Sequence, residues 1–267
     1  MIPFGARRPS HTLRRVTKIT ERAREWRNDL HTAVCDVIEP WAHGTVVRAT
    51  RYPSYWDFNV VRVEGDPGMS AHELEKVADD ALAGLVHRRV DFDDAPAAAR
   101  VRPEFEEMGW RTTALVWMRH SEPLPAGERI EVEEVPYDAV IDLRREWHRG
   151  DFGGDTDPSG YLANAREVSA TRGVQVIAAV EDGEPVGFAQ LERSGDGAEI
   201  TQVYVRPEHR GGGRGTALPA AAVEAASDAD DLWIVADAEG RPRELYRGLG
   251  FRPAWETVEF TRLPGPT

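Results

Sequence analysis

Cysteine, lysine and long apolar runs are scarce in this sequence. The lack of cysteines and of apolar runs limits the kinds of protein that it can be. A single cysteine, Cys35, occurs among 267 residues, which excludes an internal disulfide framework and a cysteine-based metal cluster. Only two of the 33 basic side chains are lysines, Lys18 and Lys76, which we interpret as coding bias. No apolar run approaches the roughly 20 residues that a membrane-spanning helix needs, so no membrane partner is expected.

The net charge of −13 is unevenly distributed along the chain. The balance is −2 up to Glu128 and −11 from Arg129 onward. An acidic surface repels nucleic acid, whose binding depends on neutralising phosphates. It weakly favours a cationic substrate such as an amine, because net charge acts on steering and not on chemistry.

Residues 1–18 are basic but contain no apolar core, so they do not read as a secretory signal. We predict a disordered basic tail here, or a start codon assigned too early. Together with the single cysteine, this predicts a cytoplasmic protein. His72-Glu73 begins a zinc-protease motif, but Lys76 stands where the second histidine belongs, so no metal site is predicted.

A polar stretch at 121–129, with prolines and a glycine, predicts a linker between two halves at 19–120 and 130–267. The halves share one similar segment: residues 105–111 and residues 246–252 carry similar residue types position by position. Such an offset is typical of a duplicated domain. Chance similarity over seven residues is the alternative.

Periodicity predicts a similar order of elements in the two halves. In the first half we expect helices at 17–37, 71–85 and 96–108, with Pro103 kinking or splitting the last, and strands at 45–49, 57–63, 88–92 and 112–118. In the second half we expect helices at 138–149, 215–226 and 241–249, and strands at 130–135, 174–180, 186–191, 200–205, 232–236 and 255–261. The pattern predicts an α/β fold with a mixed sheet.

The most informative segment is a glycine turn between a predicted strand and a predicted helix. It contains Arg210, Gly211, Gly212, Gly213, Arg214, Gly215 and Thr216, and it follows Val203, Tyr204 and Val205. Bare backbone N–H groups, a helix N-terminus and two arginines would converge there, which suits a pyrophosphate. A Walker loop is excluded because no Gly-Lys-Ser/Thr follows, and a dinucleotide fingerprint because Thr216 replaces its third glycine. A flexible glycine turn is the alternative.

Together with Tyr246, Gly250 and Phe251, this segment resembles the acetyl-CoA site of the GNAT superfamily of N-acetyltransferases. The resemblance implies two GNAT-like domains, each a mixed, mostly antiparallel sheet flanked by helices. It also implies acetyl-CoA bound along residues 203–205 and 210–216. The first half resembles a degenerate copy, since residues 64–69 carry two acids and no arginine, and Phe105 stands in place of Tyr246.

The same resemblance suggests two catalytic residues. Glu199, eleven residues before Arg210, corresponds to the general base of the histone-acetyltransferase branch; an exposed structural side chain, with Gln202 holding a water that relays the proton, is the alternative. Tyr246 corresponds to the acid that protonates the leaving thiolate, unless it only packs against the sheet. Five residues, Asp151, Phe152, Asp155, Asp157 and Tyr161, would line the acceptor site or belong to a solvated loop.

We therefore expect an N-acetyltransferase that moves an acetyl group from acetyl-CoA to a primary amine, most plausibly of a small molecule, by direct attack. No nucleic-acid or membrane partner is expected, and the chain would act as a monomer or homodimer. A CoA-binding sensor or interaction module that does not turn the thioester over is the alternative function.

Overall fold

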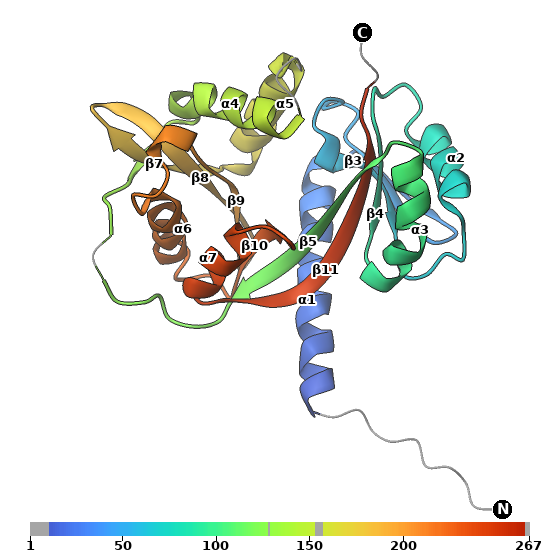
Figure 1. The fold of residues 1–267 in the computed structure, drawn as a ribbon, viewed down its shortest axis with the longest axis horizontal. Coiled ribbons are helices and arrows are strands. Elements are labelled where there is room, and N and C mark those ends of the chain that lie inside the picture. Colours follow the sequence, from blue (N-terminus) through green and yellow to red (C-terminus); the bar gives the residue numbers. More distant parts are fainter. Residues whose placement is uncertain (1–10, 128, 153–156, 265–267) are drawn as a thin grey trace, which may run out of the picture.

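The computed structural model describes residues 11–127, 129–152 and 157–264, and shows two lobes joined by long central strands (Figure 1). The first half contains α1 (His11–Val34), β1 (Val37–Trp41), β2 (Gly44–Arg48), η1 (Trp56–Phe58), β3 (Asn59–Val63), α2 (Ala71–Ala81), β4 (Arg88–Phe92), α3 (Ala95–Glu107) and β5 (Arg111–His120). The second half contains β6 (Glu133–Val135), η2 (Tyr137–Val140), α4 (Ile141–Phe152), α5 (Ser159–Arg172), β7 (Gln175–Glu181), β8 (Glu184–Ser194), β9 (Gly197–Val205), η3 (Pro207–His209), α6 (Arg214–Ala225), β10 (Asp231–Asp237), α7 (Pro242–Gly248) and β11 (Phe251–Arg262).

All eleven strands form one continuous sheet in the order β1-β2-β3-β4-β11-β5-β10-β9-β8-β7-β6. The predicted mixed, mostly antiparallel α/β architecture is confirmed, but the two halves do not have separate sheets. The last strands of the two halves are exchanged. Strand β11 of the second half pairs with β4 of the first, and β5 of the first half pairs with β10 of the second; β11 and β5 also pair with each other. No pattern in the sequence predicted this exchange of strands.

Without the edge strand β6, the strand order is symmetrical about the boundary between β11 and β5, which supports an internal duplication. In each half one pair of strands is parallel, β3 with β4 and β9 with β10, and a helix connects them, α2 or α6. The next helix, α3 or α7, leads into the exchanged strand. The similar segments, residues 105–111 and 246–252, both lie where this helix ends and the exchanged strand begins.

Several boundaries differ from the sequence-based expectation. Helix α1 begins at His11, inside the expected basic tail, and residues 1–10 lie outside the described residues. Strand β1 and helix α5 were not predicted at all. Helix α3 runs through Pro103 without being split. The expected linker holds no helix or strand in its described part, residues 121–127 and 129.

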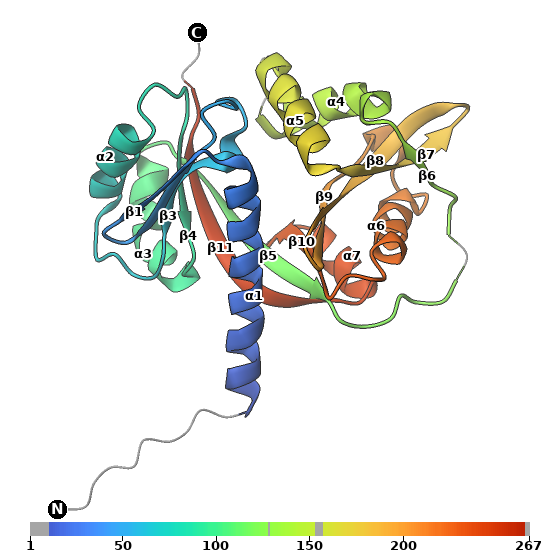
Figure 2. The same ribbon diagram turned by 180° about the vertical axis from the view of Figure 1, so that it is seen from behind.

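The two faces of the central strands pack against different helices. On one face, Ala198, Ile200 and Ile234 belong to a core that includes α6 and α7. On the other face, Trp117, Trp233 and Trp255 pack around Trp26 of α1. Alternate residues of a strand point to opposite faces, so α1 crosses the face that α6 and α7 leave uncovered (Figure 2).

Candidate functional site

The glycine turn forms an open end of α6. Gly211 has φ +85° and Gly213, the residue before the helix, has φ +89°. The N–H groups of Thr216 and Ala217 both bond to the Gly213 carbonyl, at 3.0 and 2.9 Å. The N–H groups of residues 211–215 donate to no backbone or side-chain acceptor within the described part of the chain. Five donors therefore remain available at the positive end of a helix dipole.

The equivalent helix of the first half, α2, has its own acceptors at its N-terminus. Ser70 accepts from Glu73 N at 3.3 Å, and the Glu73 carboxylate accepts from Ser70 N at 2.9 Å. Glu104 accepts from Ala71 N at 2.8 Å. Two carboxylates thus occupy the place where an anion would bind at α2. At α6 no side chain does so.

The two arginines of the turn do not converge on one point as the sequence suggested. Arg210 Nε donates to the Val205 carbonyl at 2.9 Å. Arg214 forms an ion pair with Glu181 and donates to the His209 carbonyl at 3.1 Å. Both guanidinium groups therefore brace the turn, and its backbone supplies the free donors.

Strands β9 and β10 separate next to this turn. Their pairing runs from Gly197↔Asp231 to Ile200↔Ile234 and then ends. A bulge in β9 shifts its register against β8 at this point, and Gln202 adopts φ +48°. Beyond Ile200, including Val203, Tyr204 and Val205, β9 is paired with β8 alone, so its other edge faces a gap.

The first half has no such gap. Strands β3 and β4 stay paired to Val63↔Phe92, and Asp93 N continues the ladder by donating to the Val63 carbonyl at 2.9 Å. Phe105, the counterpart of Tyr246, is fully buried and stacks on Phe260 with ring centroids 4.3 Å apart. The first half thus lacks the opening, the free helix end and the hydroxyl.

Glu199 lies on the α1 face of the sheet and is only 6% exposed, so the alternative of an exposed side chain is wrong. Its Oε2 accepts a hydrogen bond from Trp26 Nε1 at 2.7 Å. Burial, and then the nearby Glu192 carboxyl, raises the pKa of Glu199 from 4.5 to about 7. Arg172 forms an ion pair with Glu192, whereas no described cation pairs directly with Glu199.

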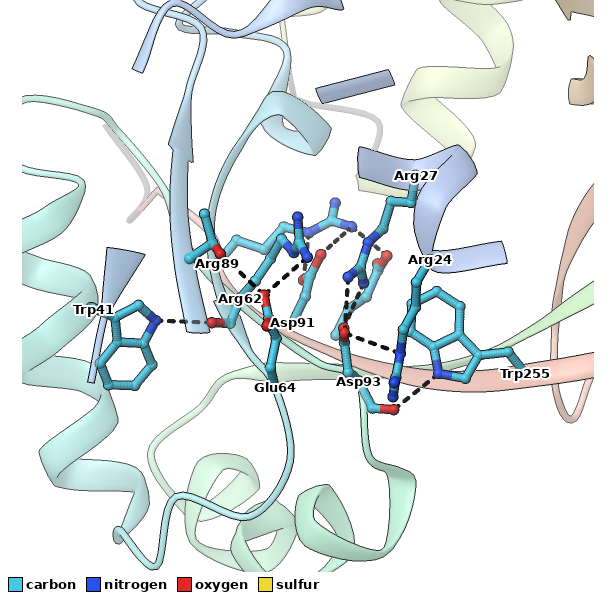
Figure 3. Close-up of polar contacts among 11 residues, drawn as sticks. Arg24, Arg27, Trp41, Arg62, Glu64, Arg89, Asp91, Asp93 and Trp255 are labelled. Atoms are coloured by element: carbon cyan, nitrogen blue, oxygen red, sulfur yellow. Dashed lines mark hydrogen bonds and ion pairs between the residues drawn. The ribbon is translucent and has the colours of Figure 1, made fainter. Parts of the chain in front are cut away.

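Trp26 packs against Trp117, Trp233 and Trp255 of the central strands, and an ion pair of its neighbour Arg27 holds α1 at this place. Next to it on α1, Arg27 donates to both oxygens of Asp93 at 2.6 and 3.0 Å, and Trp255 Nε1 donates to the Asp93 carbonyl at 3.0 Å (Figure 3). Gly197 allows the approach of the indole, because a Cβ there would lie 2.8 Å from the ring. The first half thereby positions a carboxyl group of the second half.

A cavity of about 280 Å³ opens in front of Glu199, between the two halves. Residues of six strands, β4, β11, β5, β10, β9 and β8, line it on the side of the sheet, and residues of α1, η1, α4 and α5 line the rest. A neighbouring cavity of about 210 Å³ shares four of its lining residues, Asp57, Arg89, Trp147 and Glu259. Asp151, Phe152 and Tyr161 line the second cavity, whereas Asp157 does not. Asp155 lies outside the described residues, and the acceptor wall stays a prediction.

Gln202 also lines the first cavity, but its amide is engaged at both ends. Its Oε1 accepts from Arg144 Nη1 at 2.5 Å, and its Nε2 donates to the Tyr161 hydroxyl at 2.5 Å. Arg144 is fully buried and also donates to Gln190 at 2.6 Å. No sequence pattern indicated Arg144, since an arginine in an amphipathic helix is usually exposed.

Tyr246 lies on α7, on the face of the sheet opposite Glu199, among the apolar core residues. It is 6% exposed, and its hydroxyl forms no hydrogen bond with any described residue. Burial raises the pKa of Tyr246 to about 12. The two predicted catalytic residues can therefore act on one molecule only through the gap between β9 and β10.

Comparison with known proteins agrees with this geometry. Residues 172–253, which span β7 to the beginning of β11, match the family model described as "Acetyltransferase (GNAT) domain". The C-terminal half of the chain carries a GNAT acetyltransferase domain. The GNAT match contains the glycine turn, Glu199 and Tyr246. No curated protein matches the sequence.

Several solved structures are similar to this chain. A functionally unknown conserved protein from Staphylococcus epidermidis has a TM-score of 0.60 at 12% identity, covering 86% of this chain and 95% of that one. A GCN5-related N-acetyltransferase from Sphaerobacter thermophilus has a TM-score of 0.52 at 17% identity, covering 92% and 85%. A tandem GNAT protein from the clavulanic acid biosynthesis pathway has a TM-score of 0.48 at 16% identity, covering 78% and 77%.

Among the residues that the structure describes, no group of three or more His, Cys, Asp or Glu side chains is arranged to hold a metal ion. Of the helices described, none combines the length and apolarity needed to cross a membrane.

Proposed function

We propose that this protein is an acetyl-CoA-dependent N-acetyltransferase whose acceptor is the primary amine of a small molecule. The contrast between two equivalent helix ends carries the proposal. At α2 the chain's own carboxylates occupy the N-terminus, whereas at α6 five backbone donors are free beside a gap between strands. Since the two halves share one topology, this difference marks the site where an anionic ligand binds.

The glycine turn would bind the diphosphate of acetyl-CoA, through the N–H groups of residues 211–215. The thioester supplies an activated acetyl group when it is bound. Strand β9 beyond Ile200 borders the gap with one unpaired edge, so a backbone N–H near Tyr204 would polarise the thioester carbonyl. Preorganised donors of this kind often provide the largest catalytic contribution.

Glu199 would act as the general base. An alkylamine has a pKa near 10.4, so it must lose a proton before it can attack a carbonyl carbon. A base is most effective when its pKa lies near the working pH, and burial brings that of Glu199 to about 7. The carboxyl group lines the cavity in which an amine would sit.

Tyr246 would assist departure of the CoA sulfur as a hydrogen-bond donor. With a pKa of about 12 the phenol is always protonated in the working range. A thiol has a pKa near 8.5, so complete transfer of the phenol proton to the thiolate is unfavourable by roughly 5 kcal/mol at about 1.4 kcal/mol per unit. We infer that Tyr246 stabilises the developing thiolate without becoming ionised.

The acceptor would be small because the cavity is enclosed by both halves of the chain. Calorimetry with CoA and acetyl-CoA, followed by an assay of amine-dependent thiol release, tests the proposal. We expect acetyl-CoA to bind and a primary amine to accelerate thiol release. Binding without turnover on any amine would instead identify a CoA sensor, and no binding at millimolar concentration would refute the site altogether.

A further inference from the structure

We propose that Glu192 and Arg172 form a charge pair that assigns the exchangeable proton to Glu199. Glu192 stays ionised beside Arg172, and Glu199 is the carboxyl group that accepts a proton from the acceptor's ammonium and later releases it to water. Glu192 and Arg172 are therefore positioning residues, because they act on the reaction only through Glu199. This inference rests on the proposed function and refines the part that Glu199 has in it.

Glu192 and Glu199 are direct neighbours across two strands. In the antiparallel pairing of β8 with β9, the two residues lie opposite each other. Side chains at opposite positions of such a pair point to the same face, with Cβ atoms about 4.5–5.5 Å apart. Both residues are buried, and both line the first cavity. Two buried carboxyl groups this close do not both ionise easily, so their other partners decide which of them holds a proton.

Both carboxyl oxygens of Glu192 have partners that favour the ionised form. Oε2 forms an ion pair with Arg172, the last residue of α5, whose side chain is buried. Oε1 accepts from the Thr201 hydroxyl at 3.4 Å, and that hydroxyl accepts from Gln190 Nε2 at 3.2 Å. Arg144 Nη2 donates to Gln190 Oε1 at 2.6 Å and begins this chain of donors. Each bond of the chain points its hydrogen toward Glu192, which suits an ionised carboxyl group that only accepts.

Glu199 has a single hydrogen-bond partner among the described residues. Trp26 Nε1 donates to its Oε2 at 2.7 Å, and its Oε1 has none. A neutral indole stabilises a carboxylate less than a guanidinium group does. Burial and the Glu192 carboxylate favour the protonated form, which raises the pKa of Glu199 to about 7. Burial raises the pKa of Glu192 as well, but Arg172 acts against this rise. The proton therefore belongs on Glu199.

Other charged or titratable groups lie around Glu199 on α1, η1, β4, β10 and β11 and in the loop before η1. They are Arg22, Arg27, His31, Tyr55, Asp57, Arg89, Asp91, Asp231 and Glu259. Each arginine among them has an ion-pair partner. Burial keeps His31 and Tyr55 neutral, because it lowers the pKa of the first and raises that of the second. Asp57 also raises the pKa of Glu199, but by less than Glu192 does. Glu192 is therefore the charge that acts most strongly on Glu199.

The indole N–H signal of Trp26 in an NMR titration of the full chain tests the proposal, because this group donates to Glu199. Trp26→Phe identifies the signal by its disappearance. The titration needs neither acetyl-CoA nor an amine. In the unaltered protein we expect the signal to shift with a midpoint near pH 7. In Glu199→Gln this step should be absent, since glutamine does not ionise.

Variants of the charge pair should move this midpoint in opposite directions. Glu192→Gln should lower it by at least about one pH unit, because the repulsion between like charges about 5 Å apart exceeds the free energy of one unit. Arg172→Met removes the cation and should raise the midpoint, whereas Arg172→Lys preserves the charge and should restore it. Glu224→Gln is the matched control and should leave the midpoint unchanged, because it removes an ion pair with Arg129 on α6, outside the cavity.

A midpoint that stays in place in Glu192→Gln, or that moves the same way in Glu192→Gln and Arg172→Met, would overturn the proposal. An indole signal of the unaltered protein that does not titrate around neutral pH would overturn it too, and this measurement depends on no variant of the charge pair. Thiol-release assays separate the proposal from the general function. Opposite shifts in a protein that acetylates no amine would refute the enzyme and leave the charge pair standing, whereas acetylation with an unmoved midpoint would refute the charge pair alone.

Discussion

Replacing Glu199 by glutamine should abolish most of the activity and, at alkaline pH, stabilise the protein. The substitution preserves the size of the side chain and leaves an oxygen to accept the hydrogen bond from Trp26 Nε1. Loss of a general base typically costs 10²- to 10⁴-fold in rate. We therefore expect kcat to fall by about this factor at pH 8 while the affinity for acetyl-CoA stays unchanged.

The stability effect follows from the pKa of Glu199, which burial raises from 4.5 to about 7. Between these two pH values the unfolded chain has released a proton that the folded chain still holds. The free energy of unfolding therefore falls as pH rises through this window. The shift corresponds to about 3 kcal/mol at roughly 1.4 kcal/mol per unit. Glutamine does not ionise, so the variant avoids this loss.

Chemical denaturation of both proteins at pH 4 and pH 8 measures the effect. We expect the variant to gain up to about 3 kcal/mol relative to the unaltered protein between the two conditions. In the same pH series, kcat/KM of the unaltered protein should rise about tenfold per unit below pH 7 and level off above it. A variant that keeps its activity, or a stability difference that does not change with pH, would refute the role assigned to Glu199.

Three further substitutions test neighbouring parts of the site. Trp26→Phe removes the donor that favours the ionised form of Glu199, so the acidic limb of the pH–rate profile should move up by as much as about one unit; an unmoved limb would contradict the contact. Gly213→Ala places a Cβ at φ +89° beside the free donors, which should lower the free energy of unfolding by roughly 1–2 kcal/mol and weaken CoA binding in calorimetry. Gly183→Ala, in the β7–β8 turn at φ +84°, is its control and should cost stability without weakening CoA binding. Tyr246→Phe should lower kcat at least tenfold and leave CoA affinity unchanged, and equal loss of both would indicate a packing role only.

Local pattern predicted those parts of the site that depend on backbone conformation. The glycine turn, the strand before it and the helix after it occupy consecutive residues. The turn needs positive φ angles, which glycine adopts readily, so the glycines themselves reveal it. The same holds for most helices and strands, whose apolar spacing reveals their buried face. Strand β1 escaped prediction because its edge position leaves Ile38, Glu39 and Pro40 exposed, so its residues do not alternate between buried and exposed.

Contacts between distant residues could not be predicted in this way. Trp26 and Glu199 are 173 residues apart, and nothing in either local sequence specifies the other. Their contact exists because α1 crosses the central strands and because Arg27 fastens that helix to Asp93. The buried environment that raises the pKa of Glu199 has the same origin.

The sequence by itself determined that a glycine turn follows a β-strand in the second half and that the first half has no such turn. Only the tertiary structure decided that β5 and β11 exchange places and that residues of both halves line the cavity in front of Glu199. The physical reason is the range of the interactions involved. Backbone geometry is set by neighbours along the chain, whereas burial, pairing of charges and the pKa of a carboxyl group are set by whatever the completed fold brings beside them.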